Sequence, residues 1–413
     1  MTPHATRPHD VVVFGATSFV GQILTRYLYE TFGLDGKLRW AAAGRSRPKL
    51  EQVRRALGDD AATLHLLTAD ASRPDDLRKL CASARVIVST VGPYALYGEP
   101  LVQACAETGT DYCDLTGEPQ WIRRMLEKHE ATARRTGARI VHCCGFDSVP
   151  FDLGVHFLQA RARERFGRPC SQVKMRVRKM RGGFSGGTVA SMMNLLEEVS
   201  AEPSLRRVLA DHYALCPPDR RPAVRQRDVR FAEYDADFGA WIAPFVMSAI
   251  NTRIVHRTNA LSRHSYGPEF RYEEAVLTGK GLTGRLNAVG LSGALGTMLA
   301  AGALGPTRRA LQRFVLPAPG AGPSPESQRR GSYDLRFFGR TEDGRVLRSR
   351  VTGDRDPGYG STAKILGQAA ACLALDVRPT PGAGGFPTTA VVFGDKLIER
   401  LRAHAGLTFE LLD

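Results

Sequence analysis

A short turn between an apolar run and a helical segment constrains this 413-residue chain more than any other feature. Residues 10–14 (DVVVF) are almost wholly apolar, which is typical of a strand buried on both faces of a sheet. Residues 15–21 (GATSFVG) follow directly, and residues 22–32 have the pattern of a helix. This order of elements binds the pyrophosphate of a dinucleotide, because the helix N-terminus presents free N–H groups and the positive end of its dipole. The sequence therefore predicts a Rossmann-type nucleotide-binding domain.

The individual residues of the turn suit this task. Gly15 lets the backbone turn tightly, and Gly21 lets the helix lie close to the sheet. Ser18 stands where a middle glycine often occurs, and its hydroxyl can reach a phosphate. The pattern is weak evidence alone, and its position after the first strand makes it informative. We expect the cofactor to contact Gly15, Thr17, Ser18, Phe19 and Gly21.

The end of the second predicted strand, residues 38–44, bears on the choice of cofactor. Arg45 and Ser46 follow it. Domains that prefer NAD usually have an acidic residue here for the ribose 2′-hydroxyl, whereas an arginine suits a 2′-phosphate because its planar guanidinium donates hydrogen bonds in pairs. The alternative interpretation of Arg45 is a surface arginine on a loop. We predict that the cofactor is NADP, with NADPH favoured over NADH.

Alternating strands and helices continue through the first part of the chain. Strands are predicted at residues 63–68, 85–90, 111–115 and 139–143, and helices at residues 100–108 and 119–136. These lengths predict an α/β fold with a doubly wound parallel sheet. Asp70 follows the third strand and is expected near the adenine. The nicotinamide end is expected at the carboxyl end of the fourth strand, which is followed by Thr90, Val91, Gly92 and Pro93.

Several longer segments resemble a known enzyme family. They are GATSFVG, AAAGRS, STVGPYALYGEPLVQACAETGTDYCDLTGE and CCGFDSVPFDLG, followed by GGFSGGTVASM, NTRIVHRTNAL, PAPGAGPS and GYGSTAKI. Over nearly its whole length the chain resembles saccharopine dehydrogenase-like oxidoreductases, and more closely the mycobacterial trans-acting enoyl reductases. The resemblance implies a nicotinamide-dependent reduction of a carbon–carbon double bond in a long lipid intermediate left by a polyketide synthase. It does not imply saccharopine as substrate. Ser18 departs from the glycine of many relatives.

Beyond Cys144 the composition changes, and a second, α+β domain is expected. The predicted division is a Rossmann NADP-binding domain at 8–145, a substrate domain at 146–356, and a C-terminal helical segment at 357–413 that packs back on the first domain. In the second domain we expect helices at residues 153–166 and 189–200, strand-like runs at 173–179, 246–256 and 270–277, and a hairpin of residues 333–338 and 346–351. An apolar helix is expected at residues 362–376.

Residues 286–304 carry no acidic or basic side chain and are rich in Gly, Ala and Leu. Arg308, Arg309 and Arg313 follow. Three interpretations stay open: a buried or substrate-lining helix, a helix attached to a membrane surface, and a membrane span. The glycine and alanine content makes the segment only mildly hydrophobic, which argues against a span. Residues 317–325 are rich in Pro and Gly and predict a lid or a plain connector.

Enoyl reduction requires stabilisation and protonation of an enolate. Tyr94 follows the fourth strand, so its hydroxyl is the first candidate proton donor and Tyr97 is the second, with packing as the alternative role. Asp147 follows the last predicted strand of the first domain and is a candidate for positioning water or substrate. The alternative for this junction is a helix N-cap formed by Ser148 or Asp152. No metal site is predicted.

Charge and cysteine content limit the partners. Lys+Arg 57 against Asp+Glu 42 gives a net charge of +15, which favours anionic partners such as cofactor phosphates, an acidic acyl carrier or an anionic membrane. No helix has a basic stripe interleaved with aromatic residues, so nucleic acid is not expected. The eight cysteines lack CxxC spacing and residues 1–10 lack signal-peptide features, which predicts a cytoplasmic protein.

Three further points stay open at this stage. They are peripheral association with the inner face of the membrane, a homodimer, and the function itself. The alternatives to enoyl reduction are a carbonyl reductase or dehydrogenase that acts on another lipid or amino-acid-derived substrate, and a non-catalytic NADPH-binding protein associated with membranes or lipid.

Overall fold

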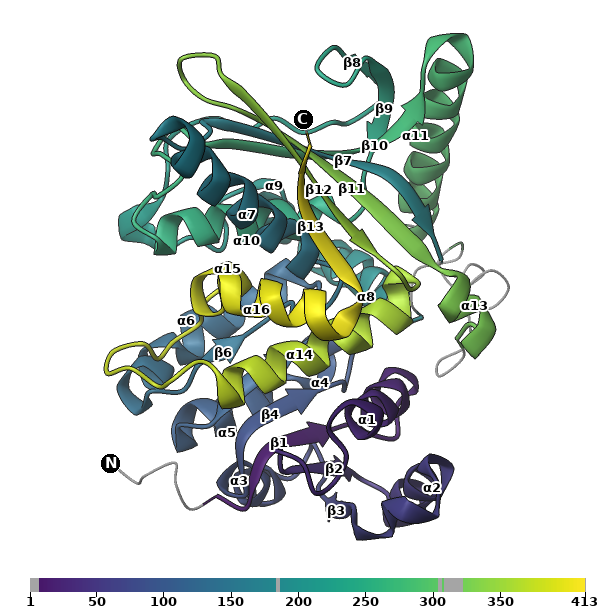
Figure 1. The fold of residues 1–413 in the computed structure, drawn as a ribbon, viewed down its shortest axis with the longest axis vertical. Coiled ribbons are helices and arrows are strands. Elements are labelled where there is room, and N and C mark those ends of the chain that lie inside the picture. Colours follow the sequence, from purple (N-terminus) through teal and green to yellow (C-terminus); the bar gives the residue numbers. More distant parts are fainter. Residues whose placement is uncertain (1–6, 183–185, 304–306, 308–321, 413) are drawn as a thin grey trace. The chain divides into compact units, whose positions relative to one another are not determined.

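The computed structural model describes residues 7–182, 186–303, 307 and 322–412, and the chain divides into two compact units (Figure 1). Unit 1 comprises Met1–Phe146, Gly320–Gly322 and Tyr359–Ala405. Unit 2 comprises Asp147–Pro319, Pro323–Gly358 and Gly406–Asp413. The division differs from the expected one at the C-terminus, where the last residues belong to unit 2 as a strand rather than to a helical segment.

Unit 1 is built on a six-stranded parallel sheet of order β3-β2-β1-β4-β5-β6. Its strands are β1 (His9–Phe14), β2 (Trp40–Gly44), β3 (His65–Thr68), β4 (Ala84–Ser89), β5 (Asp111–Asp114) and β6 (Ile140–Val141). Every residue of β1 and β2 is buried, which accounts for their continuous apolar runs. Strand order and direction confirm the predicted doubly wound Rossmann fold.

Helices connect these strands and cover the sheet. They are α1 (Phe19–Phe32), α2 (Arg47–Leu57), α3 (Pro74–Ala82), α4 (Tyr94–Tyr97), α5 (Glu99–Thr108) and α6 (Pro119–Thr136), and later in the chain α14 (Thr362–Leu375), α15 (Thr389–Val392) and α16 (Asp395–Arg400). The apolar helix α14 packs against α1 and against strands β1, β4 and β5. The chain therefore returns to the first sheet after it has formed most of unit 2.

Unit 2 contains a seven-stranded mixed sheet of order β13-β12-β11-β7-β10-β9-β8. Its strands are β7 (Gln172–Arg181), β8 (Glu233–Asp235), β9 (Ala240–Pro244), β10 (Arg271–Gly279), β11 (Ser332–Arg340), β12 (Val346–Gly353) and β13 (Leu407–Leu412). Strands β7 and β10 pair in parallel, and the other neighbours are antiparallel. The predicted hairpin is confirmed as β11–β12.

The helices of unit 2 are α7 (Val149–Phe166), α8 (Gly186–Ala201), α9 (Leu205–Ala210), α10 (Ser248–Leu261), α11 (Gly281–Ala303) and α13 (Pro325–Arg330). The prediction of a strand at residues 246–256 was wrong, since most of this run forms α10. This helix is buried on nearly all sides, including Asn251, Arg253 and His256. A helix buried all round shows no polar face, and its Ile, Val and Thr content then resembles a strand.

Among the described residues no helix, α11 included, is long and apolar enough to cross a bilayer. Two of the features singled out after α11 fall outside the described residues. They are the arginines Arg308, Arg309 and Arg313, and residues 317–321 of the Pro/Gly-rich segment.

Candidate functional site

The turn between β1 and α1 is packed too tightly for side chains at its two glycines. Gly15 has φ of +89°, and a Cβ there would lie 2.7 Å from Thr90 Oγ1. A Cβ on Gly21 would lie 2.1 Å from the carbonyl oxygen of Gly15. The first turn of α1 therefore lies directly against the backbone of the turn, as a site that brings a pyrophosphate close to a helix N-terminus requires.

Ser18 caps α1. The N–H of Gly21 donates to Ser18 Oγ over 2.9 Å, and the hydroxyls of Ser18 and Thr90 are 3.0 Å apart. Thr90 in turn donates to the Gly15 carbonyl oxygen over 2.9 Å. The Ser18 hydroxyl thus has both an acceptor and a donor role within the turn. In the part of the chain that the structure describes, the N–H groups of Thr17, Phe19 and Val20 have no partner, so they are available to a phosphate.

Two side chains directly after β2, those of Arg45 and Ser46, have no hydrogen-bond partner among the described residues. Arg45 is exposed, and its side chain makes no hydrogen bond or ion pair to any described residue. Ser46 precedes α2, and its side chain makes no capping hydrogen bond. Arg47 differs, because it donates to Glu51 and to the Leu66 carbonyl oxygen. The free guanidinium and hydroxyl fit the 2′-phosphate of NADP.

Asp70, two residues beyond β3, is held in a local turn. Its carboxylate accepts hydrogen bonds from the N–H and the hydroxyl of Ser72, at 2.9 and 2.8 Å. These bonds lower the pKa of Asp70, and the charge of nearby Arg45 lowers it further. Asp70 therefore lies within electrostatic reach of Arg45, at the same edge of the sheet, and its predicted place near the adenine stays a prediction.

Tyr94, the first candidate proton donor, is buried at the start of α4. Its hydroxyl donates to the Ser89 carbonyl oxygen over 2.9 Å and accepts from the Leu115 N–H over 3.1 Å. Burial, and next the charge of Asp114, raise its pKa well above the ordinary value for tyrosine. A phenol that joins the ends of β4 and β5 and resists ionisation fits the packing alternative. Tyr97, at the other end of α4, is 52 % exposed and has no hydrogen bond to a described residue.

The first unit, with its strand order and its glycine turn, matches a known sequence family over residues 11–141, the saccharopine dehydrogenase NADP binding domain. The chain is 42% identical over 98% of its length, and 97% of the relative's, to a Mycobacterium tuberculosis protein named "Putative trans-acting enoyl reductase Rv2449c". It is 38% identical, over 97% of each chain, to a trans-acting enoyl reductase of Mycobacterium bovis. The chain belongs to the saccharopine dehydrogenase-like oxidoreductases. It is an NADP-binding oxidoreductase related to the mycobacterial trans-acting enoyl reductases.

A solved structure supports the fold of this family member. Apo saccharopine dehydrogenase (L-Glu forming) from Saccharomyces cerevisiae matches with a TM-score of 0.56, covering 98% of this chain and 100% of that one, at 12% identity. At this identity the likeness concerns the fold alone. It agrees with a Rossmann sheet followed by a second, mixed sheet.

Asp147, the first residue of unit 2, is partly exposed and has no hydrogen bond or ion pair within the described residues. Loss of solvation raises its pKa to about 6. The adjacent Ser148 does not cap α7 with its side chain, and its hydroxyl instead donates to Asn251 over 3.0 Å. Asn251 then donates to Glu274, which also accepts from Tyr272. Asp147 therefore stands beside a buried polar chain.

Sequence reasoning missed two groups at the carboxyl edge of the first sheet. Asp114 and His142, at the ends of β5 and β6, form a buried pair with 2.6 Å between Oδ2 and Nδ1. His142 Nε2 has no partner among the described residues. Glu118 accepts hydrogen bonds from the N–H groups of Tyr94 and Ala95, both at 2.9 Å, and so fixes the start of α4. Polar residues at the ends of buried strands were the available signal.

Proposed function

We propose that this protein is an NADPH-dependent enoyl reductase that acts on a lipid or polyketide-derived acyl intermediate. Similarity at 38–42% identity along nearly the whole chain to trans-acting enoyl reductases carries the proposal. The glycine turn and the free Arg45 support the cofactor part of it. The basic excess of the chain suits a substrate delivered by an acidic acyl carrier.

In this proposal the residues of unit 1 hold the cofactor, and bound NADPH supplies the hydride. The N–H groups of Phe19 and Val20 bind the pyrophosphate, and Gly15 and Gly21 leave room for it. Arg45 and Ser46 bind the 2′-phosphate and thereby favour NADPH over NADH. Thr17, Val91, Gly92 and Pro93, on the turn and after β4, complete the predicted contacts.

The proton for the enolate needs a donor that is free to reach substrate. Tyr94 is committed to Ser89 and Leu115, so we place the donor at Tyr97, whose exposed hydroxyl is unpaired among the described residues. Asp147, with a pKa near 6, is mostly ionised at neutral pH and accepts a hydrogen bond from water or substrate.

The reaction is tested with two thioesters of N-acetylcysteamine, trans-2-dodecenoyl and 3-oxododecanoyl. We expect oxidation of NADPH with the first and none with the second. With NADPH deuterated at carbon 4 of the nicotinamide, mass spectrometry should find one deuterium at carbon 3 of the saturated product. Turnover of the 3-oxo thioester alone would establish the carbonyl reductase alternative instead. NADPH binding without turnover of either thioester would favour the non-catalytic alternative.

A separate variant tests whether Tyr97 is the proton donor. Tyr97→Phe should lower kcat at least tenfold while it leaves the Kd for NADPH unchanged, because a general acid contributes to the chemical step and not to cofactor binding. An unchanged kcat would remove Tyr97 from the mechanism.

A further inference from the structure

Helix α11 is attached to the rest of unit 2 by a narrow stripe of small residues. Gly284, Ala288 and Ser292, spaced four apart, are buried and face strands β9 and β10. A Cβ on Gly284 would lie 2.3 Å from the Gly279 carbonyl oxygen, so the helix lies directly on the backbone there. The Thr278 hydroxyl lies 2.9 Å from the Gly284 carbonyl oxygen and fixes the same end. The first half of α11 is thus held by this stripe, and α11 also contacts α8, where Gly302 lies close to Leu196.

The remaining sides of α11 expose aliphatic side chains. Leu282 is 71% exposed and Leu286 is 63% exposed, and three further aliphatic residues are exposed by about two fifths. These are Val289, Leu291 and Leu299. A surface helix of a soluble domain normally turns charged and polar residues outward, as α6 does with Arg123, Glu127 and Lys128. The buried-helix interpretation of this segment therefore fails for most of its length.

Exposed aromatic residues and a cation flank the first half of α11. The Arg285 guanidinium lies 5.4 Å from the centre of the Trp241 ring, and Trp241 meets the ring of Tyr234 edge-to-face at 5.9 Å. Tyr234 and Phe231 are both more than half exposed. Trp241 and Tyr234 belong to β9 and β8, and both strands contact α11 (Figure 1). Aliphatic, aromatic and arginine side chains together are the composition that favours the interface between lipid headgroups and acyl chains.

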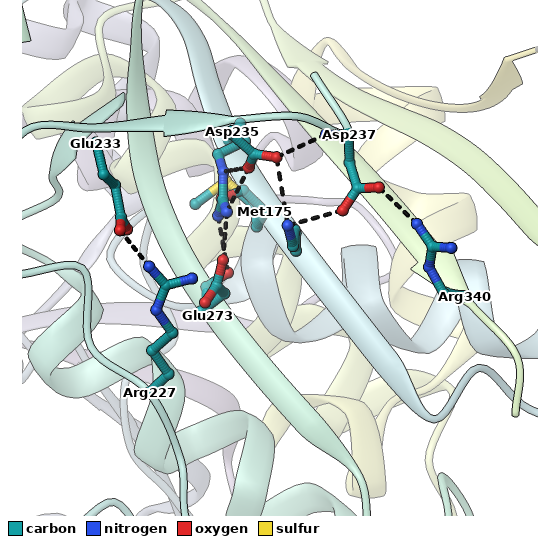
Figure 2. A network of polar contacts seen from close by, with 9 residues as sticks. Met175, Arg227, Glu233, Asp235, Asp237, Glu273 and Arg340 are labelled. Carbon is teal, nitrogen blue, oxygen red and sulfur yellow. Dashed lines mark hydrogen bonds and ion pairs between the residues drawn. The ribbon is translucent and has the colours of Figure 1, made fainter. Parts of the chain in front are cut away.

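The acidic residues on β8, just after β8 and at Glu273 of β10 pair with basic side chains. Figure 2 shows Glu233 paired with Arg227, and Asp237 paired with Arg340. Asp235 pairs with Lys174 and with the buried Arg176, which also binds Glu273. In sequence, no Asp or Glu occurs between Glu274 and Glu326, whereas Lys280, Arg285, Arg308, Arg309 and Arg313 do. Within the described residues, α11 and the turn before it therefore carry Lys280 and Arg285 and no acidic residue.

We infer that this surface, defined by Leu282, Arg285, Leu286, Val289 and Tyr234, docks on a bilayer that contains anionic phospholipids. The charge favours this occupant over a second copy of the chain, because anionic headgroups neutralise Lys280 and Arg285, whereas a second copy offers the same basic residues. The helix lies in the interface plane, with its aliphatic side chains among the upper acyl carbons. The inference does not depend on the proposed reductase activity.

The test uses the full chain and vesicles of phosphatidylcholine with 30 mol% phosphatidylglycerol, in a flotation assay. We expect the wild type to float with these vesicles, and to bind vesicles of phosphatidylcholine alone at least tenfold more weakly. Leu282→Asp combined with Leu286→Asp should reduce binding to the anionic vesicles at least tenfold. The matched control is Leu375→Asp with Val391→Asp, which makes the same charge change at exposed sites of unit 1 and should bind as the wild type does.

Tryptophan fluorescence distinguishes docking through the α11 surface from non-specific binding of the protein to vesicles. Trp40 and Trp121 are buried, so a blue shift of tryptophan emission on anionic vesicles reports Trp241. The shift should be absent from the Leu282→Asp/Leu286→Asp variant, whose melting temperature should match that of the wild type. Failure of the wild type to bind the anionic vesicles would overturn the inference, as would unchanged binding by that variant. A wild-type dimer that the same variant dissociates in ultracentrifugation would assign the surface to a second copy instead.

Discussion

The two sheets of this protein place buried charge differently. The central strands of unit 1, β1, β2 and β4, bury mainly apolar and small residues after the His9 and Asp10 that begin β1, and other buried charges of this sheet, such as the pair of Asp111 and Arg139, lie on β5 and beside β6. The candidate cofactor site of unit 1 depends on backbone groups that lie close together. The sheet of unit 2 buries Arg176 completely, and Arg176 pairs with both Asp235 and Glu273. A nucleotide site built from backbone geometry tolerates little added volume, whereas a sheet built around buried charges tolerates little change in charge.

The largest expected effect is on stability and comes from removing Arg176 from its buried ion pairs with Asp235 and Glu273. Arg176→Met keeps most of the side-chain volume but leaves two carboxylates buried without their common partner. Removal of one partner from a buried ion pair costs about 3–5 kcal/mol. We expect the free energy of unfolding, measured with urea, to fall by that amount.

Strand β7 provides the matched control for this change. Arg178 is on the same strand, is 61% exposed, and pairs with Asp334 over 3.1 Å. Arg178→Met should cost less than about 1 kcal/mol, because exposed ion pairs contribute little. The double variant Arg176→Met/Glu273→Gln should recover part of the loss by removing one uncompensated carboxylate. Equal effects of the two arginine changes would remove the contrast between buried and exposed charge in this sheet.

The second prediction concerns Glu274, an uncompensated acid in unit 2. Burial raises its pKa to about 8, although Tyr272 and Asn251 donate to it. Because the folded state holds this proton more tightly than the unfolded state, the stability from Glu274 is complete below about pH 4.5 and is lost as the pH rises through 8. Glu274→Gln should remove a fall of roughly 3 kcal/mol between pH 5 and pH 7.

The measurement is the free energy of unfolding at several pH values for both proteins. Parallel curves would mean that Glu274 is ionised in the folded state. A curve for Glu274→Gln that lies higher at pH 8 and meets the wild type near pH 4.5 would support the buried neutral acid.

The same contrast explains which parts of the fold could be predicted. The strands of unit 1 follow from apolar runs and short connections, because a sheet covered on both faces leaves little choice of residue. Residues 246–256 and the final strand β13 could not be predicted in this way. The first forms a helix buried on nearly all sides, and the second pairs with β12 from far along the chain.

The candidate site divides along similar lines. The turn at residues 15–21 and Arg45 could be proposed from the sequence, because each is a local pattern after a strand. The bonds of Tyr94 to Ser89 and Leu115 could not be found, because they depend on β4 and β5 lying side by side. The pair of Asp114 and His142 required the same knowledge of strand order.

The third prediction tests the steric limit of the cofactor turn. In Gly21→Ala the new Cβ would lie 2.1 Å from the Gly15 carbonyl oxygen, so the turn must shift. We expect a loss of about 2 kcal/mol in stability and a loss of measurable NADPH binding in calorimetry. Gly290→Ala in α11 is the matched control, because its Cβ would meet nothing within 4 Å. It should be neutral or stabilise by up to about 1 kcal/mol.

The smallest expected effect is on the preference for NADPH over NADH. It comes from the loss of a charged hydrogen-bond donor and not from a steric clash. Arg45→Ala should weaken NADPH binding about tenfold, close to 1.4 kcal/mol, and leave NADH binding unchanged, because only NADPH carries the 2′-phosphate. Arg135→Ala, which removes an exposed arginine without a described partner from the end of α6, controls for the loss of general positive charge. Calorimetric titration of the three proteins with both cofactors decides the matter. If Arg45→Ala and Arg135→Ala weaken NADPH binding equally, the preference for NADPH arises from the overall positive charge of the protein. If only Arg45→Ala does so, one side chain at the end of β2 sets the choice of cofactor in a site otherwise built from backbone.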